Sequence, residues 1–212
     1  MRKRNRLDEA VVLLQRADAV AVPVLGPEHP TVSVIWNNLG DLEVDRGPWL
    51  EAEPCYRKAL AVSEAKLGPT HPQTLTIVEN LGSLFLQQAK ATGAEALFRR
   101  VLKADGTDIN AWHHLAQAQL LQHRWTEAQT FLTGLAPELG SEPERGACVL
   151  TELAAVYLQK QDFVRVERAL SEAPVLEGFR PSDGLESRRL TKPMRGCYGI
   201  GGAPRTPNGW RA

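Results

Sequence analysis

The sequence contains few of the residue patterns that build catalytic and metal sites. It has only three cysteines, Cys55, Cys148 and Cys197, which lie far apart and form no CxxC pair. This usage fits reduced thiols in the cytoplasm better than a disulfide framework or a zinc site. No HExxH metal motif and no GxSxG nucleophile motif occurs. We therefore expect no enzymatic activity, no metal and no cofactor.

Long apolar runs and a continuous basic stretch are also missing. No segment approaches the ~20 apolar residues of a membrane span. The basic segment 2–6 precedes an apolar stretch, but the longest clean apolar run there, 19–25, is too short for a convincing secretory signal. Residues 7–173 carry 14 basic and 22 acidic side chains, whereas both ends are basic. Because phosphate binding needs a continuous basic face, we expect a soluble cytoplasmic chain that binds neither nucleic acid nor membrane.

What the sequence does contain is an internal repeat. The hexapeptide 25–30, LGPEHP, returns 42 residues later as LGPTHP at 67–72. Other residues keep the same offset, namely Asn38-Leu39-Gly40 with Asn80-Leu81-Gly82, Ala52 with Ala94, and Leu60 with Leu102. Self-similarity at a fixed period of this length is typical of a solenoid, in which each unit buries its apolar face against its neighbours.

Each period predicts two helices. Ile35, Leu39 and Leu42 have the spacing of one face of a first helix, and Tyr56 and Ala59 lie on one face of a second. Gly-Pro and His-Pro pairs separate these segments, since glycine ends helices and proline suits a first turn. The repeating unit is therefore helix–turn–helix–loop.

The residues of this unit resemble a known family. Trp36-x2-Leu39-Gly40, followed by Ala52 and Tyr56, is similar to the tetratricopeptide pattern W-x2-L-G and A-x3-F. The 42-residue period with LGPxHP between units resembles the repeats of kinesin light chains. The resemblance implies an all-α, right-handed superhelical solenoid of antiparallel helix pairs. Small residues at 40 and 52 would let the paired helices approach closely, with Tyr56 filling space around them.

The repeat pattern divides the chain into three parts. A third unit begins at Trp112-x2-Leu115-Ala116, and a fainter fourth lies between Leu150 and Ala173. After Pro174, glycine, proline, arginine and serine dominate and no apolar periodicity remains. We predict a basic N-terminus with a lone helix at 1–24, an array of about four repeats at 25–174, and a disordered tail at 175–212.

The lone first helix has two interpretations. It aligns with a second helix of the repeat whose partner is missing, so we expect it to expose an apolar face that includes Leu7, Val11 and Leu14. The helix is either a cap or the start of a truncated piece of a longer array. Its apolar face suggests an alternative function, a self-associating architectural segment. A fragment of a larger multidomain repeat protein is a further alternative.

The histidines do not predict a metal site. His29 and His71 belong to the repeat's own loop, so a structural role is expected. His113 and His114 are adjacent on a helix and point about 100° apart, which prevents easy chelation of one ion.

The resemblance also implies a binding surface. In tetratricopeptide arrays the first helix of each pair lines a concave groove that holds an extended peptide or a partner helix. The matching positions in this sequence are Asn37, Asn38, Asp41, Glu79, Asn80, Ser83, His113, His114, Gln117, Thr151 and Glu152.

The composition of this predicted groove restricts the partner. Amides such as Asn38 and Asn80 can both donate to and accept from a peptide backbone, although they could instead only tie neighbouring helices together. Members of the family that clamp acidic peptide C-termini use Lys and Arg in the groove, and this set contains none. We expect a protein or peptide partner of unknown identity that is neutral or partly basic.

Overall fold

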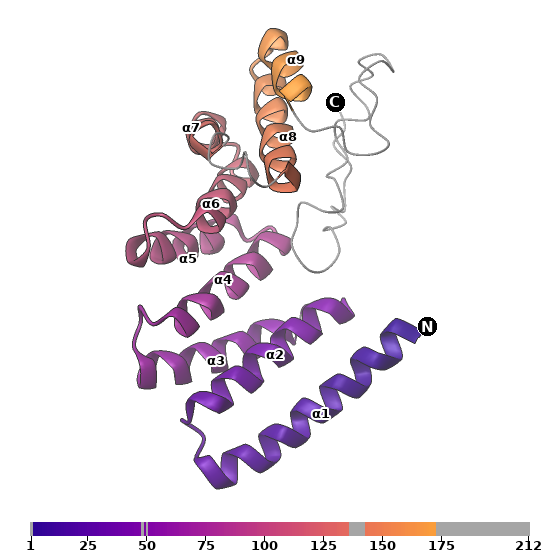
Figure 1. Cartoon of the computed structure of the whole chain (residues 1–212), viewed down its shortest axis with the longest axis vertical. Helices are drawn as coiled ribbons and strands as arrows, with labels where there is room; N and C mark the ends of the chain where they lie inside the picture. The colour runs from indigo at the N-terminus through magenta and orange to yellow at the C-terminus, as the bar shows by residue number, and fades with distance from the viewer. Residues whose placement is uncertain (1, 48, 50, 136–142, 173–212) are drawn as a thin grey trace. The chain divides into compact units, whose positions relative to one another are not determined.

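The protein was analysed as a computed structural model that describes residues 2–47, 49, 51–135 and 143–172. All regular elements in these residues are α-helices, which confirms the predicted all-α class (Figure 1). The helices are α1 (Arg2–Leu25), α2 (Pro30–Arg46), α3 (Ala52–Leu67), α4 (Pro72–Gln87), α5 (Ala91–Ala104), α6 (Ile109–Leu121), α7 (Trp125–Leu135), α8 (Pro143–Gln159) and α9 (Phe163–Glu172). The predicted tail at 175–212 lies outside the described residues.

The described chain forms two compact units. Unit 1 runs to Ala111 and holds α1 to α5 with the first turn of α6, and unit 2 begins at Trp112 and holds the rest of α6 with α7 to α9. Within the described ranges, no helix combines the length and the apolar character needed to cross a membrane.

The loop residues of the repeat explain where the helices of unit 1 begin and end. His29 is the N-cap of α2, and its Nδ1 accepts a hydrogen bond from the Thr31 N–H at 3.2 Å; His71 caps α4 in the same way through the Gln73 N–H. A proline follows each histidine in the first turn, where its missing N–H costs nothing. The predicted structural role of both histidines is confirmed. They satisfy backbone donors that the helix itself leaves unpaired.

Close contact between paired helices depends on two glycines. A methyl group at Gly40 would lie 2.5 Å from the Tyr56 ring of α3, and one at Gly82 would lie 2.8 Å from the Phe98 ring of α5. Ala52 at the start of α3 is fully buried. The prediction that small residues permit close approach is therefore confirmed, and the aromatic ring of each second helix fills the space over the glycine.

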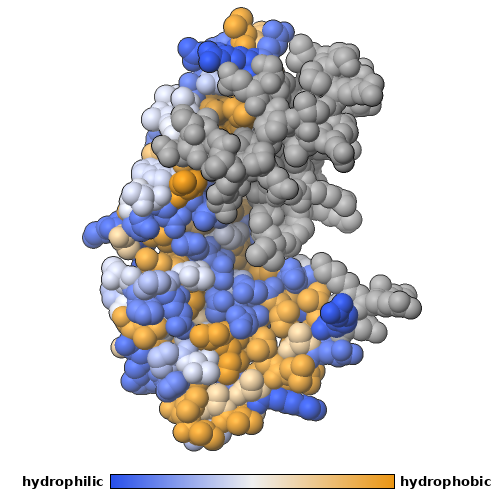
Figure 2. Space-filling view, in the orientation of Figure 1, coloured by the Kyte–Doolittle hydropathy of each residue, from blue (hydrophilic) through white to orange (hydrophobic). Residues whose placement is uncertain are grey.

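The exposed face of α1 was predicted wrongly. Val11 is only 5% exposed and Leu14 is partly buried, because both pack toward the apolar residues of α2. Large apolar side chains of α1 remain in solvent (Figure 2), and all of them except Leu25 lie outside the angular range of the Leu7–Val11–Leu14 stripe. They are Val12, Leu13, Val20, Val24 and Leu25. The Leu7–Val11–Leu14 stripe is the packing face because a second helix of the repeat also contacts the first helix of the next pair.

Unit 2 repeats the pairing with weaker sequence signals. Trp112 of α6 packs on Phe131 of α7, with ring centroids 4.8 Å apart. Ala154 of α8 packs with Val166 and Ala169 of α9, and all three are buried. These contacts form the pairs that the sequence predicted for the third and fourth units.

Candidate functional site

Six of the predicted groove residues lie on the first helices of unit 1. We call them the polar face of α2 and α4: Asn37, Asn38, Asp41, Glu79, Asn80 and Ser83. At 100° per residue, positions 37, 38 and 41 fall on one side of α2, and the 42-residue offset places 79, 80 and 83 on the matching side of α4. The two helices are in contact, and the structure brings Asn37 and Asp41 of α2 together with Asn80 of α4.

A hydrogen-bond network fixes part of this polar face. The Asn80 Nδ2 donates to Asn37 Oδ1 at 3.0 Å and to Asp41 Oδ1 at 3.3 Å, which joins α4 to α2. The Asn37 Nδ2 donates to Asp41 Oδ2 at 3.3 Å, and the Tyr56 hydroxyl of α3 donates to Asp41 Oδ1 at 2.6 Å. The amide of Asn80 thus ties neighbouring helices together, which was one of its two predicted roles. The network fixes the positions of α2, α3 and α4 relative to one another.

Asn38 differs from Asn80. Its side chain is exposed to solvent, and no hydrogen bond of its amide is recorded within the described residues. Val34, one turn earlier on the same side of α2, is 42% exposed and places an apolar side chain beside the amide. The surface of α2 therefore combines an exposed amide with an exposed apolar side chain.

The electrostatics of the polar face are acidic. Burial, together with the negative charge of Asp108, raises the pKa of Glu79 to about 7. Burial also raises the pKa of Asp41, although the hydrogen bond from Tyr56 opposes this. In the described part of unit 1, no ion pair of Glu79 is recorded. A positive charge near Glu79 would restore its ionised form at neutral pH.

The remaining predicted residues lie in unit 2. His113 Nε2 is 3.0 Å from Glu152 Oε2, and the Gln117 Nε2 donates to Glu152 Oε1 at 2.8 Å. These bonds join α6 to α8, and the His113 and Glu152 side chains are both largely buried. His114 and Thr151 are half-buried on the same two helices. The predicted set therefore forms two clusters, one in each unit.

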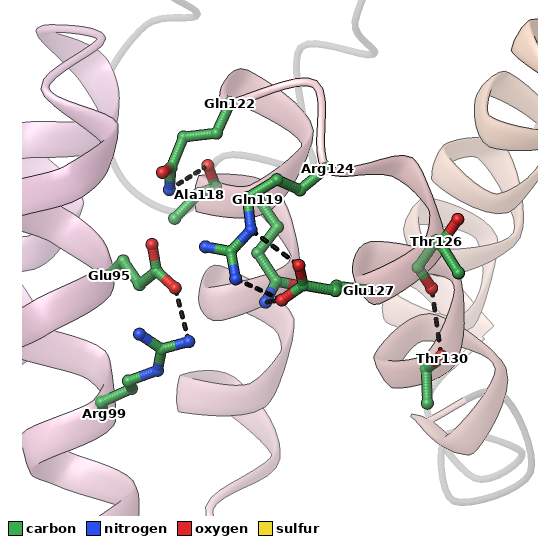
Figure 3. A network of polar contacts seen from close by, with 9 residues as sticks. All are labelled: Glu95, Arg99, Ala118, Gln119, Gln122, Arg124, Thr126, Glu127 and Thr130. Carbon is green, nitrogen blue, oxygen red and sulfur yellow. Dashed lines mark hydrogen bonds and ion pairs between the residues drawn. The ribbon is translucent and has the colours of Figure 1, made fainter.

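Basic side chains are scarce on the helices that carry these clusters. α4 and α6 contain no Lys or Arg, and the one in α2, Arg46, pairs with Glu43 at 2.7 Å and with Asp8 at 3.0 Å. Figure 3 shows another basic side chain that is paired with a carboxylate: the Arg124 guanidinium binds Glu127 in unit 2. Such neutralised cations do not form a clamp for a carboxylate ligand.

Two residues beside the polar face were not among the predicted groove residues: Tyr56 was predicted only to fill space, and Val34 was not predicted at all. A signal for Tyr56 was present, because Asp41 and Tyr56 of the first unit are replaced together by Ser83 and Phe98 in the second. A hydroxyl donor and its carboxylate acceptor thus disappear as a pair. Val34 had no such signal, since its exposure depends on how the helices pack.

In the described residues, no group of His, Cys, Asp and Glu side chains is arranged to hold a metal ion. What the arrangement offers is hydrogen-bond donors and acceptors in fixed positions, together with negative charge.

Comparison with known proteins agrees with the repeat pattern. A tetratricopeptide repeat model matches residues 31–106, and a second tetratricopeptide repeat model matches residues 85–145. Together they span more than half of the 212 residues. No curated protein matches the sequence.

Solved structures with the same fold are available. The chain is similar to a putative kinesin light chain of Podosopora anserina with nearly identical TPR-like repeats, at a TM-score of 0.70 and 20% identity over 81% of this chain and 86% of that one. It is also similar to BtubC (BKLC) from P. vanneervenii, at a TM-score of 0.73 and 20% identity over 86% of this chain and 79% of that one. MamA of AMB-1 matches at a TM-score of 0.55 and 22% identity over 80% of this chain and 86% of that one.

Proposed function

Because this chain belongs to the tetratricopeptide repeat family and resembles kinesin light chain, we propose that it is a scaffold that binds an extended peptide or partner helix along the polar face of α2 and α4. Tetratricopeptide arrays are protein-interaction scaffolds in general, and they act by presenting a surface. No bond is made or broken in this function.

The observation that carries the proposal is the contrast between Asn80 and Asn38. The Asn80 amide is used within the chain and holds α4 against α2, whereas the Asn38 amide stands exposed on a helix that is already fixed in place. A preorganised surface loses little conformational entropy on binding. Asn38 can both donate to and accept from the main chain of an extended ligand, and Val34 adds an apolar contact.

The charge of the polar face selects the partner. Asp41 and Glu79 are acidic, and α4 contains no basic residue. A peptide that ends in two carboxylates would meet repulsion there, whereas a Lys or Arg side chain would be attracted. We expect a neutral or partly basic protein ligand and no nucleic acid. Because the isolated cysteines fit a reducing compartment, we place this binding in the cytoplasm.

A panel of fluorescent peptides tests this function by anisotropy. Peptides with an internal Lys or Arg should bind, and an acidic C-terminal pentapeptide should not. Asn38→Ala should weaken binding about fivefold or more, since it removes one or two hydrogen bonds of about 1 kcal/mol each. Val164→Ala, which shortens an exposed side chain in unit 2, is the control. Tight binding of the acidic pentapeptide, or equal binding by Asn38→Ala, would contradict the proposal.

Self-association through α1 is a second candidate function. Ala10, Leu13, Ala17, Val20 and Val24 are spaced by three and four residues in turn, which is the a/d pattern of a two-helix seam. Leu13, Val20 and Val24 are 63, 66 and 74% exposed. Two copies of α1 that pack antiparallel through this seam would form a symmetric dimer.

Sedimentation at several concentrations tests the second candidate. A dimer that is lost in Leu13→Asp and Val20→Asp, but kept in the control Val164→Asp, would support association through this face. A monomer at all concentrations would exclude it and leave the peptide-binding function untouched.

A further inference from the structure

A pocket of about 380 Å³ opens among the first three helices of unit 1. Its size is in the range of small-ligand sites and suits a single long side chain better than a peptide segment. The lining residues are Gln15 and Asp18 of α1, Trp36, Leu39 and Glu43 of α2, Glu51 at the N-cap of α3, and Cys55 within α3.

This pocket is separate from the polar face of α2 and α4. Helical geometry places positions 36, 39 and 43 on one side of α2 and positions 37, 38 and 41 on the other, roughly half a turn away. No residue belongs to both sets. Unit 1 can therefore bind one ligand on each side of α2.

The lining of the pocket is acidic. Three carboxylates, Asp18, Glu43 and Glu51, face no Lys or Arg within the lining set. One Glu43 oxygen accepts from Arg46 at 2.7 Å, so that charge is partly neutralised from outside the pocket. The Asp18 Oδ1 is buried and has no hydrogen-bond partner among the described residues. A buried acceptor without a donor is unfavourable, and a ligand N–H would satisfy it.

Trp36 contributes an aromatic surface. Its ring attracts positive charge, since the Lys58 ammonium lies 4.0 Å from the ring centroid. Cys55 is 8% exposed, and burial together with the charge of Glu43 raises the pKa of its thiol, so it remains neutral. The pocket thus combines carboxylates, an indole and a small apolar surface, and no metal-ligating arrangement occurs in this described region.

We propose that this pocket binds the guanidinium group of an arginine side chain presented by a partner protein. A guanidinium carries five N–H donors in one plane, so it can bond to carboxylates on separate helices and stack on an indole at the same time. A lysine ammonium is a compact charge without this planar fork of donors, so it matches carboxylates on separate helices less well. The pocket is a second recognition site, independent of the peptide bound along α2 and α4.

The test is an NMR titration of the full chain with N-acetyl-arginine amide and with N-acetyl-citrulline amide. The two compounds have nearly the same shape, but only the first is charged. The arginine compound should shift the Trp36 indole N–H resonance, identified by its loss in Trp36→Phe, and should bind at least about tenfold more tightly. Equal binding of the two compounds would overturn the proposal.

Variants of the lining locate the site. Asp18→Asn and Glu51→Gln preserve side-chain size, and each should weaken arginine binding about fivefold or more. Glu9→Gln is the matched control, because it removes the same charge from an exposed position of α1 that is outside the lining. Unchanged binding in both pocket variants, or equal weakening in Glu9→Gln, would show that the effect is general electrostatics and would contradict a defined site. Circular dichroism of each variant verifies the fold.

Discussion

Replacing Gly40 by alanine should destabilise unit 1 although alanine is the better helix former. A methyl group at this position would lie 2.5, 2.7 and 2.9 Å from three carbons of the Tyr56 ring. The ring cannot move aside easily, because Tyr56 is 3% exposed and its hydroxyl donates to Asp41 at 2.6 Å. Overpacking of this kind costs about 1–3 kcal/mol. Alanine recovers about 0.5–1 kcal/mol of helix propensity, so we expect a net loss of about 1–2 kcal/mol.

Gly134→Ala is the matched control for this prediction. Gly134 lies within α7, is exposed, and has no atom within 4 Å of the position a methyl group would take. The same substitution should therefore stabilise the chain there, by about 0.5 kcal/mol. Urea unfolding followed by circular dichroism at 222 nm measures both variants. A Gly40→Ala variant that is as stable as wild type, or that gains stability as Gly134→Ala does, would refute the packing argument.

Three further predictions concern Glu79, the N-cap residue His71, and the buried residue Val11. Burial raises the pKa of Glu79 to about 7 from an unfolded value of 4.5, so the free energy of unfolding should fall as pH rises through this interval. Glu79→Gln should remove this pH dependence. At pH 8 the variant should raise the free energy of unfolding in urea by about 1–2 kcal/mol, a value discounted for the water around the half-buried carboxylate. His71→Ala should cost about 1 kcal/mol by removing the N-cap of α4, whereas His71→Asn should retain most of the stability, and an equal loss in both would exclude capping. Val11→Ala should cost about 1–2 kcal/mol because Val11 is buried, whereas Leu13→Ala should be nearly neutral in monomeric protein, and the reverse order would contradict the orientation of α1.

Much of the fold was predictable because the repeat compares the chain with itself. The LGPxHP loop places a helix stop and a proline start at the same point of each period, and the structure caps α2 and α4 there with His29 and His71. Gly40 and Gly82 recur opposite Tyr56 and Phe98, so the close packing of the paired helices could be predicted from the small glycines and the large aromatic rings.

The orientation of α1 was harder to predict. An isolated helix with apolar residues on two sides does not reveal from its own sequence which side meets α2. Val11 and Leu14 form the clearer apolar stripe, and the prediction that this stripe is exposed is wrong. The structure places it against the next repeat, as the 42-residue alignment with α3 would have indicated.

The polar residues of the candidate site were predictable by position only. The alignment put Asn38 and Asn80 at equivalent places, yet the structure exposes one and bonds the other to Asn37 and Asp41. Asn80 finds its partners on α2, the first helix of the preceding repeat, whereas the only described helix before α2 is α1, which aligns with a second helix and places no such residues beside Asn38. The pocket beside Trp36 depends on three helices at once, and no single repeat encodes it.

The most direct test of the proposed function is selection of a randomised peptide library on the full chain, carried out in parallel on Asn38→Ala. We predict enriched peptides that carry an internal Lys or Arg, that lack a C-terminal pair of acidic residues, and that lose enrichment on the variant. Enrichment of peptides with an acidic C-terminus, or equal enrichment on Asn38→Ala, would contradict binding along the polar face of α2 and α4.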